Sequence, residues 1–272
     1  MVGIYGFGGI GKTTMAKVLY NRIGAQFMIT SFIANVREDS KSRGLLYLQK
    51  QLLHDILDPY DKSRLCFKRF FLFLMISRII VTTRDKHLLE LHGMDALYEA
   101  KKLDHKEAIE LFCWNAFKQN HPKEDYETLS NSVVHYVNGL PLGLKILGCF
   151  LYGKTICQWE SELQKLQREP NQEIQRVLKR SYDELDDTQQ QIFLDIACFF
   201  NGEEKDFVTR ILDACNFYAE SGIGVLGDKC FVTILDNKIW MHDLLQQMGR
   251  EIVRQECPKD HGKWSDCAIP RL

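Results

Sequence analysis

The sequence predicts an α/β domain at the N-terminal end, followed by a helical region that closes with a β-hairpin and a last helix. Three observations support this fold class. A short apolar run, 2–5, leads through a glycine-rich stretch into a helix-like run. From residue 104 onward, apolar residues recur mainly at helical spacing. Near the end, two strand-like runs, 231–234 and 238–241, flank a turn.

Composition sets broad limits on the function. At 272 residues, the chain has room for two or three units, since domains usually hold ~100–200 residues. The apolar share of 45% and the charged share of 26% are ordinary for a soluble globular protein. The net charge of −1 gives no general attraction for nucleic-acid phosphates, so we expect no nucleic-acid partner.

The cysteines and apolar runs indicate where the protein works. The nine cysteines form no C-x-x-C pair, and we interpret them as buried, reduced thiols rather than disulfides or zinc ligands. No signal peptide is visible, and the longest apolar stretches, 70–76 and 192–200, are too short to span a bilayer. We therefore expect a cytoplasmic protein, with the nucleus as an alternative, and no membrane partner.

The glycine-rich stretch Gly6–Thr14 has the pattern G-x-x-x-x-G-K-T between the first strand and the first helix. Glycines let the backbone wrap a phosphate with inward N–H groups, and the helix adds its positive N-terminal end. Lys12 would place a charge between the β- and γ-phosphates, while the Thr13 hydroxyl would reach Mg²⁺. We predict a purine nucleotide, with adenine favoured; the alternative is a glycine-rich turn without a ligand.

The next elements of the α/β domain follow from local patterns. The expected helices are 12–24 and 44–57, and the expected strands are 30–36 and 97–100. Two further strand-like runs, Phe70–Met75 and Ile79–Thr82, are nearly fused. Parallel neighbours need a crossover of about a dozen residues, and Phe70–Met75 ends without the acidic residue that would hold Mg²⁺. The two runs could form one long strand, or one could be displaced from the sheet. We infer that a segment carrying the acidic strand end and its crossover is missing.

The helical region begins at Asp104. Four helices are expected over the ranges 105–117, 124–137, 142–151 and 158–166. After a boundary at Pro170 come three more helices, the hairpin and a last helix, over 173–185, 189–200, 204–215, 231–241 and 244–255. Asp187 is expected to cap the helix from Gln189 onward. Helices followed by a hairpin and another helix indicate a winged-helix unit.

Several stretches of the chain resemble one family, the nucleotide-binding region (NB-ARC) of plant disease-resistance receptors in the STAND class of P-loop switch ATPases. The matching stretches are 2–14, 32–37, 77–89, 139–144, 193–202 and 241–255. Phe193–Phe200 (FLDIACFF) and Met241–Val253 (MHDLLQQMGREIV) are most similar to the branch that carries an N-terminal TIR domain and leucine-rich repeats. Neither of these two regions has a counterpart in the printed sequence.

The resemblance implies an α/β P-loop NTPase domain, an all-α bundle and a winged helix around one adenine nucleotide. The expected domains are 1–103, 104–170 and 171–256, followed by an irregular tail, 257–272. In the family, the ADP form is at rest, and exchange for ATP opens the molecule. The partners implied are an adenine nucleotide, ADP or ATP with Mg²⁺, and other immune-receptor chains.

The resemblance also implies a set of site residues. The phosphate loop contributes Gly6, Gly8, Gly9, Ile10, Gly11, Lys12, Thr13 and Thr14. In the family pattern, Arg84 senses the γ-phosphate, Pro141 packs near the adenine, and His242 contacts the β-phosphate. Each of these three has a simpler interpretation: an Arg84–Asp85 surface ion pair, a helix-start proline, and a packed core histidine. Asp243 is interpreted as a helix N-cap answered by Gln246.

The missing acidic strand end limits the expected chemistry, because Mg²⁺ and the attacking water lose their main protein ligand. We predict no catalytic residue and at most a weak ATPase. The leading hypothesis is an ADP/ATP switch of an intracellular immune receptor with impaired hydrolysis. The alternatives are a working P-loop hydrolase, a partner-binding module that does not need nucleotide, and a defective truncated product.

Overall fold

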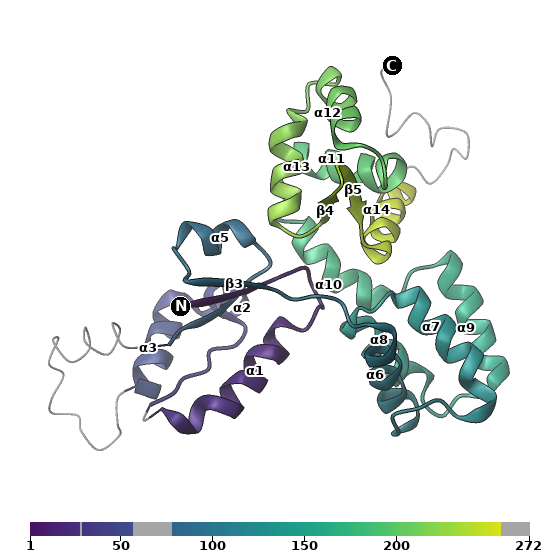
Figure 1. Cartoon of the computed structure of the whole chain (residues 1–272), viewed down its shortest axis with the longest axis horizontal. Coiled ribbons are helices and arrows are strands. Elements are labelled where there is room, and N and C mark those ends of the chain that lie inside the picture. The colour runs from purple at the N-terminus through teal and green to yellow at the C-terminus, as the bar shows by residue number, and fades with distance from the viewer. Residues whose placement is uncertain (28, 57–77, 257–272) are drawn as a thin grey trace, which may run out of the picture. The chain divides into compact units, whose positions relative to one another are not determined.

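The computed structural model describes residues 1–27, 29–56 and 78–256. The chain divides into two compact units, and each is described here by itself (Figure 1). The first unit comprises 1–4, 12–82 and 94–98, and the second comprises 5–11, 83–93 and the chain from residue 99 onward. The domain boundaries expected from the sequence stay predictions.

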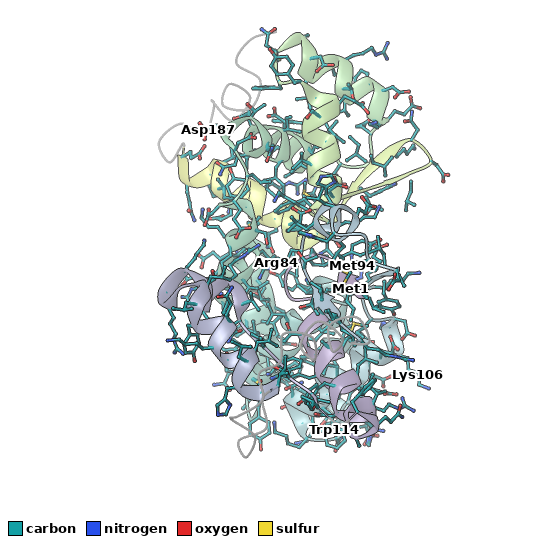
Figure 2. The ribbon with its side chains drawn as sticks, turned by 90° about the vertical axis from the view of Figure 1, so that its left-hand side faces the viewer. Met1, Arg84, Met94, Lys106, Trp114 and Asp187 are labelled. Carbon is teal, nitrogen blue, oxygen red and sulfur yellow. The ribbon has the colours of Figure 1, made fainter. Side chains whose placement is uncertain are left out.

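A three-stranded sheet forms the centre of the first unit, with the strand order β2-β1-β3. Its strands are β1 (Val2–Tyr5), β2 (Ile80–Thr82) and β3 (Ala96–Glu99). β1 and β2 are parallel, with Val2 opposite Ile80. At the start of β3, the Asp95 N–H donates to the Met1 carbonyl over 3.0 Å, and Figure 2 shows Met1 beside Met94. The parallel pair agrees with the α/β class that the sequence predicts.

The described part of the first unit also holds three α-helices, α1 (Lys12–Ile23), α2 (Val36–Arg43) and α3 (Leu45–Ile56), and a short 3-10 helix, Gly24–Gln26. The predicted strand over 30–36 is wrong, because 30–35 is irregular and Val36 already begins α2. Side chains hold this segment: the Tyr20 and Thr30 hydroxyls lie 3.1 Å apart, and the Phe32 ring meets that of Tyr20 edge-on. A left-handed backbone at Asn35 (φ 52°) then ends the extended run.

The nearly fused runs are only partly described. Ile80–Thr82 forms β2, close to its predicted range. Phe70–Met75 lies outside the described residues, so the inference of a missing strand end and crossover stays a prediction.

The second unit contains the helical bundle, whose main helices are α6 (His105–Phe117), α7 (Glu127–Val137), α8 (Pro141–Leu151) and α9 (Ile156–Arg168). Trp159 forms the centre of its core: the ring is fully buried and stacks on Phe117, with ring centroids 5.4 Å apart. The Trp159 indole N–H donates to the Leu151 carbonyl over 3.1 Å, so the buried ring leaves no unsatisfied donor. These helices match the predicted ones closely. A six-residue helix, α5 (Lys86–Leu91), precedes them and was not predicted.

The part of the chain that the sequence predicts to be a winged helix, 171–256, follows; it is called the winged-helix part below. Its elements are α10 (Gln172–Tyr182), α11 (Asp187–Asp195), a π-helix (Ile196–Phe200), α12 (Lys205–Ala214), α13 (Ala219–Asp228), β4 (Val232–Leu235), β5 (Lys238–Met241) and α14 (Asp243–Glu256). β4 and β5 pair antiparallel around Asp236 and Asn237, both left-handed as a two-residue hairpin turn requires. The predicted hairpin and last helix are confirmed. α13, with three glycines in its pattern, was missed.

One helix start differs from its prediction. Asp186, rather than Asp187, caps α11: its carboxylate accepts from the Gln189 N–H over 2.8 Å, and the Gln189 side chain answers as acceptor. The capping-box spacing requires the Gln three residues after the cap, and Asp186 satisfies it.

The six described cysteines are free. Cys113 is buried, and burial raises the pKa of its thiol to about 11. Cys149 and Cys157 are exposed, so the expectation of buried thiols is wrong for these two. Within the described ranges, no helix is long and apolar enough to cross a membrane.

The contact between α14 and the π-helix depends on the small size of Gly249. A Cβ atom there would lie 2.5 Å from the Cβ of Ala197 and 3.2 Å from the Phe193 ring. We expect Gly249→Ala to destabilise the protein by about 1–3 kcal/mol through overpacking, as measured by urea unfolding. Gly224→Ala on α13 is the control, since its Cβ would meet no atom within 4 Å. It should be neutral or stabilising by about 0.4–1 kcal/mol. Equal losses for both variants would contradict the packing argument.

The Asp195 carboxyl predicts a pH dependence of stability. It is buried with Gln191 as its hydrogen-bond donor, and burial raises its pKa to about 7. Between pH 4 and 7 the unfolded chain loses this proton while the folded chain keeps it, so the contribution to stability falls as pH rises. The free energy of unfolding of Asp195→Asn, relative to that of wild type, should therefore rise by on the order of 1–3 kcal/mol between pH 5 and pH 8, as measured by urea unfolding. The exposed Asp187→Asn variant should show no such gain (Figure 2).

Candidate functional site

The glycine-rich loop between β1 and α1 has the backbone that its sequence predicts. Gly6, Gly9 and Gly11 have φ angles of 145°, 83° and 95°, which side-chain-bearing residues rarely adopt. The loop ends where α1 begins at Lys12. The Lys12 side chain is largely buried, whereas Thr13 and Thr14 are exposed at the first turn of α1. Lys12, Thr13 and Thr14 belong to the first compact unit and the loop to the second.

The N-terminal end of α8 packs directly on the loop. The Leu142 N–H donates to the Gly9 carbonyl over 3.2 Å, and a Cβ on Gly9 would lie 2.8 Å from the Cβ of Leu142. Pro141 occupies the first helical position, and its Cγ lies 4.0 Å from the place of a Cβ on Gly11. Pro141 is therefore a helix-start proline that also contacts the loop, and the two interpretations are compatible.

Arg84, which follows β2, lies close to the loop and donates hydrogen bonds to α10. A Cβ on Gly8 would lie 3.4 Å from the Arg84 Cζ atom. The Nη1 of Arg84 donates to the Ser181 hydroxyl over 2.5 Å and to the Val177 carbonyl over 3.4 Å. The guanidinium is thus placed at the loop by acceptors from another helix.

Asp85, the residue after Arg84, forms an ion pair with Lys229. The Lys229 Nζ lies 3.4 Å from the Asp85 Oδ2, and both side chains are mostly buried. The other oxygen, Oδ1, accepts from the Leu88 N–H and caps α5. Asp85 therefore links the segment after β2 to the end of α13.

His242 reaches the loop through Phe7. The two rings are tilted with centroids 5.0 Å apart. Nδ1 accepts from the Leu244 N–H over 3.2 Å, so the ring proton is on Nε2, which donates to the Asn138 carbonyl over 3.2 Å. Burial lowers the pKa of this imidazole, against a smaller opposing effect of the Asn138 hydrogen bond, and favours the neutral ring.

The predicted role of Asp243 as an N-cap is wrong. His242 caps α14 instead, since its carbonyl accepts from the Leu245 and Gln246 N–H groups and its ring from that of Leu244. The Asp243 carboxylate accepts from the Asn138 Nδ2 over 2.8 Å. A neighbouring helix end provided a better donor for this carboxylate than the first turn of its own helix.

The structure brings six of the predicted residues close to one another within the second unit. Gly8, Gly9 and Gly11 lie close to Arg84, Leu142 and Pro141 respectively, and the His242 ring contacts that of Phe7 in the loop. The roles of the predicted residues toward a nucleotide stay predictions.

Sequence reasoning missed four contributors: Phe7, Asn138, Val177 and Ser181. Asn138 was visible as a helix stop, and it does end α7 in a left-handed conformation (φ 50°). The other three carry no local signal, since a helical serine, a backbone carbonyl and a loop phenylalanine are ordinary features.

The sequence is similar to those of known plant disease-resistance proteins. A family model described as a Roq1-like disease resistance protein, winged-helix domain, matches residues 186–257. The chain is 50% identical to the disease resistance protein RUN1 and 49% identical to RPV1, both of Vitis rotundifolia, in each case over 97% of this chain. It is 37% identical to the TMV resistance protein N of Nicotiana glutinosa, again over 97% of this chain.

These homologues are plant disease-resistance proteins, and the chain spans 22%, 21% and 26% of their respective lengths. The alignments with RUN1 and N run over 299 and 305 residues, more than the 272 of this chain, so the relatives carry residues in the matched region that this chain lacks. A solved signal-transduction ATPase with a tetratricopeptide-repeat sensor, from Pyrococcus horikoshii, aligns over 98% of this chain and 41% of its own, at 15% identity and a TM-score of 0.28.

The ring of His242 yields a prediction about its protonation. Because burial favours the neutral form, its titration midpoint should lie below the usual 6.5, with the proton on Nε2 in the neutral state. NMR of the imidazole nitrogens across pH 4.5–8 measures both, with His242→Gln to assign the signals. A midpoint at or above 6.5, or a proton on Nδ1, would contradict the capping arrangement.

Proposed function

We propose that this chain is the nucleotide-dependent switch region, of the NB-ARC type, of an intracellular plant immune receptor of the TIR branch. The observation that carries the proposal is the convergence on one glycine loop of Arg84, the start of α8, and the His242–Phe7 pair. In this proposal the chain holds ADP at rest in the cytoplasm or nucleus, and it acts by changing conformation.

The loop residues fit the phosphate groups of a nucleotide. Three glycines with positive φ supply a backbone that can turn N–H groups toward phosphate, and α1 adds a helix N-terminus. The bound nucleotide would supply phosphate charge and, as the triphosphate, the γ-phosphate that distinguishes the two states. Lys12 would bind the phosphates, Thr13 the metal ion, and Pro141 the adenine side.

His242 would connect the winged helix to the nucleotide. Its ring lies against Phe7 of the loop and caps the first turn of α14. In the proposed resting state, a β-phosphate would accept the Nε2 proton in place of the Asn138 carbonyl. Arg84 would sense a γ-phosphate.

Hydrolysis is not central to this function. The run Phe70–Met75 ends without an acidic residue, and alignments longer than the chain agree with a shortened nucleotide domain. We therefore propose a switch with impaired hydrolysis. The proposed partners beyond nucleotide are other immune-receptor chains.

Nucleotide binding is tested by thermal melting at increasing ADP concentration, together with assay of ADP released on denaturation. At an ADP concentration 100 times its Kd, binding should stabilise the folded chain by about 2.7 kcal/mol. Lys12→Ala should abolish this shift, while Lys50→Ala, an exposed lysine on α3, should keep it.

Other outcomes identify the alternatives. A protein that releases no ADP on denaturation, and whose melting temperature does not change with ADP concentration, would favour the partner-binding module. Steady phosphate release that Lys12→Ala abolishes would favour the hydrolase. A chain without a cooperative melt would favour the defective product.

A further inference from the structure

The guanidinium of Arg84 is bound by two acceptors that lie one turn apart on α10. Its Nη1 donates to the Ser181 hydroxyl over 2.5 Å and to the Val177 carbonyl over 3.4 Å. The carbonyl at i−4 and the hydroxyl at i lie on the same face of a helix. Ser181 and Val177 therefore form a paired acceptor site that takes both hydrogens of one guanidinium nitrogen.

This paired site is in a protected position. Ser181 is only 9% exposed and shares the buried side of α10 with Ile174 and Leu178. Hydrogen bonds to a charged donor are stronger than neutral ones, and more so where water is excluded. The contact is thus a substantial attachment of α10 to the segment that follows β2.

The same guanidinium already lies against the phosphate loop. The place of a Cβ on Gly8 is 3.4 Å from both Cζ and Nη1 of Arg84, and 3.5 Å from the Val177 carbonyl oxygen. The guanidinium and the helix carbonyl thus both border the space beside the Gly8 Cα atom. A γ-phosphate on this loop and the acceptors of α10 would therefore compete for the same Nη1 hydrogens.

We propose that Ser181, with the Val177 carbonyl, is a competing acceptor that holds Arg84 away from a γ-phosphate and so favours ADP over ATP. The inference rests on the proposed function and names its regulation. A triphosphate would take Arg84 from α10, and the first helix of the winged-helix part would lose its attachment. Only ATP carries the γ-phosphate that Arg84 would contact. By thermodynamic linkage, an acceptor that Arg84 must leave for this contact therefore weakens the binding of ATP more than the binding of ADP.

A second attachment supports the coupling. Asp85, the next residue, pairs with Lys229 over 3.4 Å, and these side chains are 20% and 24% exposed. Two consecutive residues after β2 thus contact α10 and the end of α13 separately. A displacement of Arg84 would be transmitted to both places.

The test is the ratio of the ATP and ADP dissociation constants, measured by titration calorimetry on the full chain. Ser181→Ala removes the hydroxyl acceptor, so the preference should shift toward ATP by roughly ten-fold, as expected for one hydrogen bond to a charged group. Ser181→Thr keeps a hydroxyl and should keep the wild-type ratio. Ser132→Ala is the control, because the Ser132 hydroxyl donates to the Thr128 carbonyl of its own helix on the exposed side of α7.

A double-mutant cycle shows whether the effect passes through Arg84. In an Arg84→Ala background, Ser181→Ala should leave the ratio unchanged, since no guanidinium remains to be released. Hydrogen exchange of the nucleotide-free protein adds a readout that needs no ligand. Both single variants should exchange faster at α10 amides near 177–181 than wild type does.

The outcomes separate the two proposals. If wild type binds nucleotide but Ser181→Ala leaves the ratio unchanged, the competition is overturned and the proposed function stands. If wild type binds neither ATP nor ADP, the proposed function fails and the competition with it. A ratio that shifts equally in the Arg84→Ala background would also overturn the competition, because the effect would not depend on the guanidinium.

Discussion

The close approach of the Gly9 backbone to Leu142 is the constraint on which the site depends. The two backbones are joined by a hydrogen bond of 3.2 Å, and a side chain at Gly9 would overlap Leu142. Only a residue without Cβ, at a φ of 83°, allows this contact. With the loop held against the start of α8, Arg84 and the Phe7–His242 pair can meet it from other segments. The phosphate loop is thus also a packing centre of the second unit.

Asn138 organises the polar contacts on one side of this centre. Its carbonyl faces His242, its amide donates to Asp243, and its side-chain oxygen accepts from the Lys102 Nζ over 2.6 Å. Asn138 ends α7 in a left-handed backbone conformation. One helix stop therefore connects the last helix of the winged-helix part to the bundle. The neutral state of His242 follows from this burial and from the two hydrogen bonds of its ring.

Local patterns predicted the fold where the physical signal is local. Apolar spacing located α6 and α8, and the strand–glycine–helix order located the loop. The prediction was wrong at 30–36, where β-branched and aromatic residues form an irregular segment held by side chains. It also missed α13, whose glycines weaken a helical pattern that tertiary packing nevertheless stabilises: a Cβ on Gly222 would lie 2.2 Å from Ile192.

By itself, the sequence determined the phosphate-loop backbone, most helices, the hairpin and the resemblance that names the candidate residues. These depend on neighbours within a few positions, so composition and spacing suffice. Only the tertiary structure decided that Ser181 and Val177 bind Arg84, that Asp85 pairs with Lys229, and that His242 rather than Asp243 caps α14. Each of these joins groups whose partners are chosen by packing, because a buried donor or charge bonds the nearest acceptor that the fold brings to it.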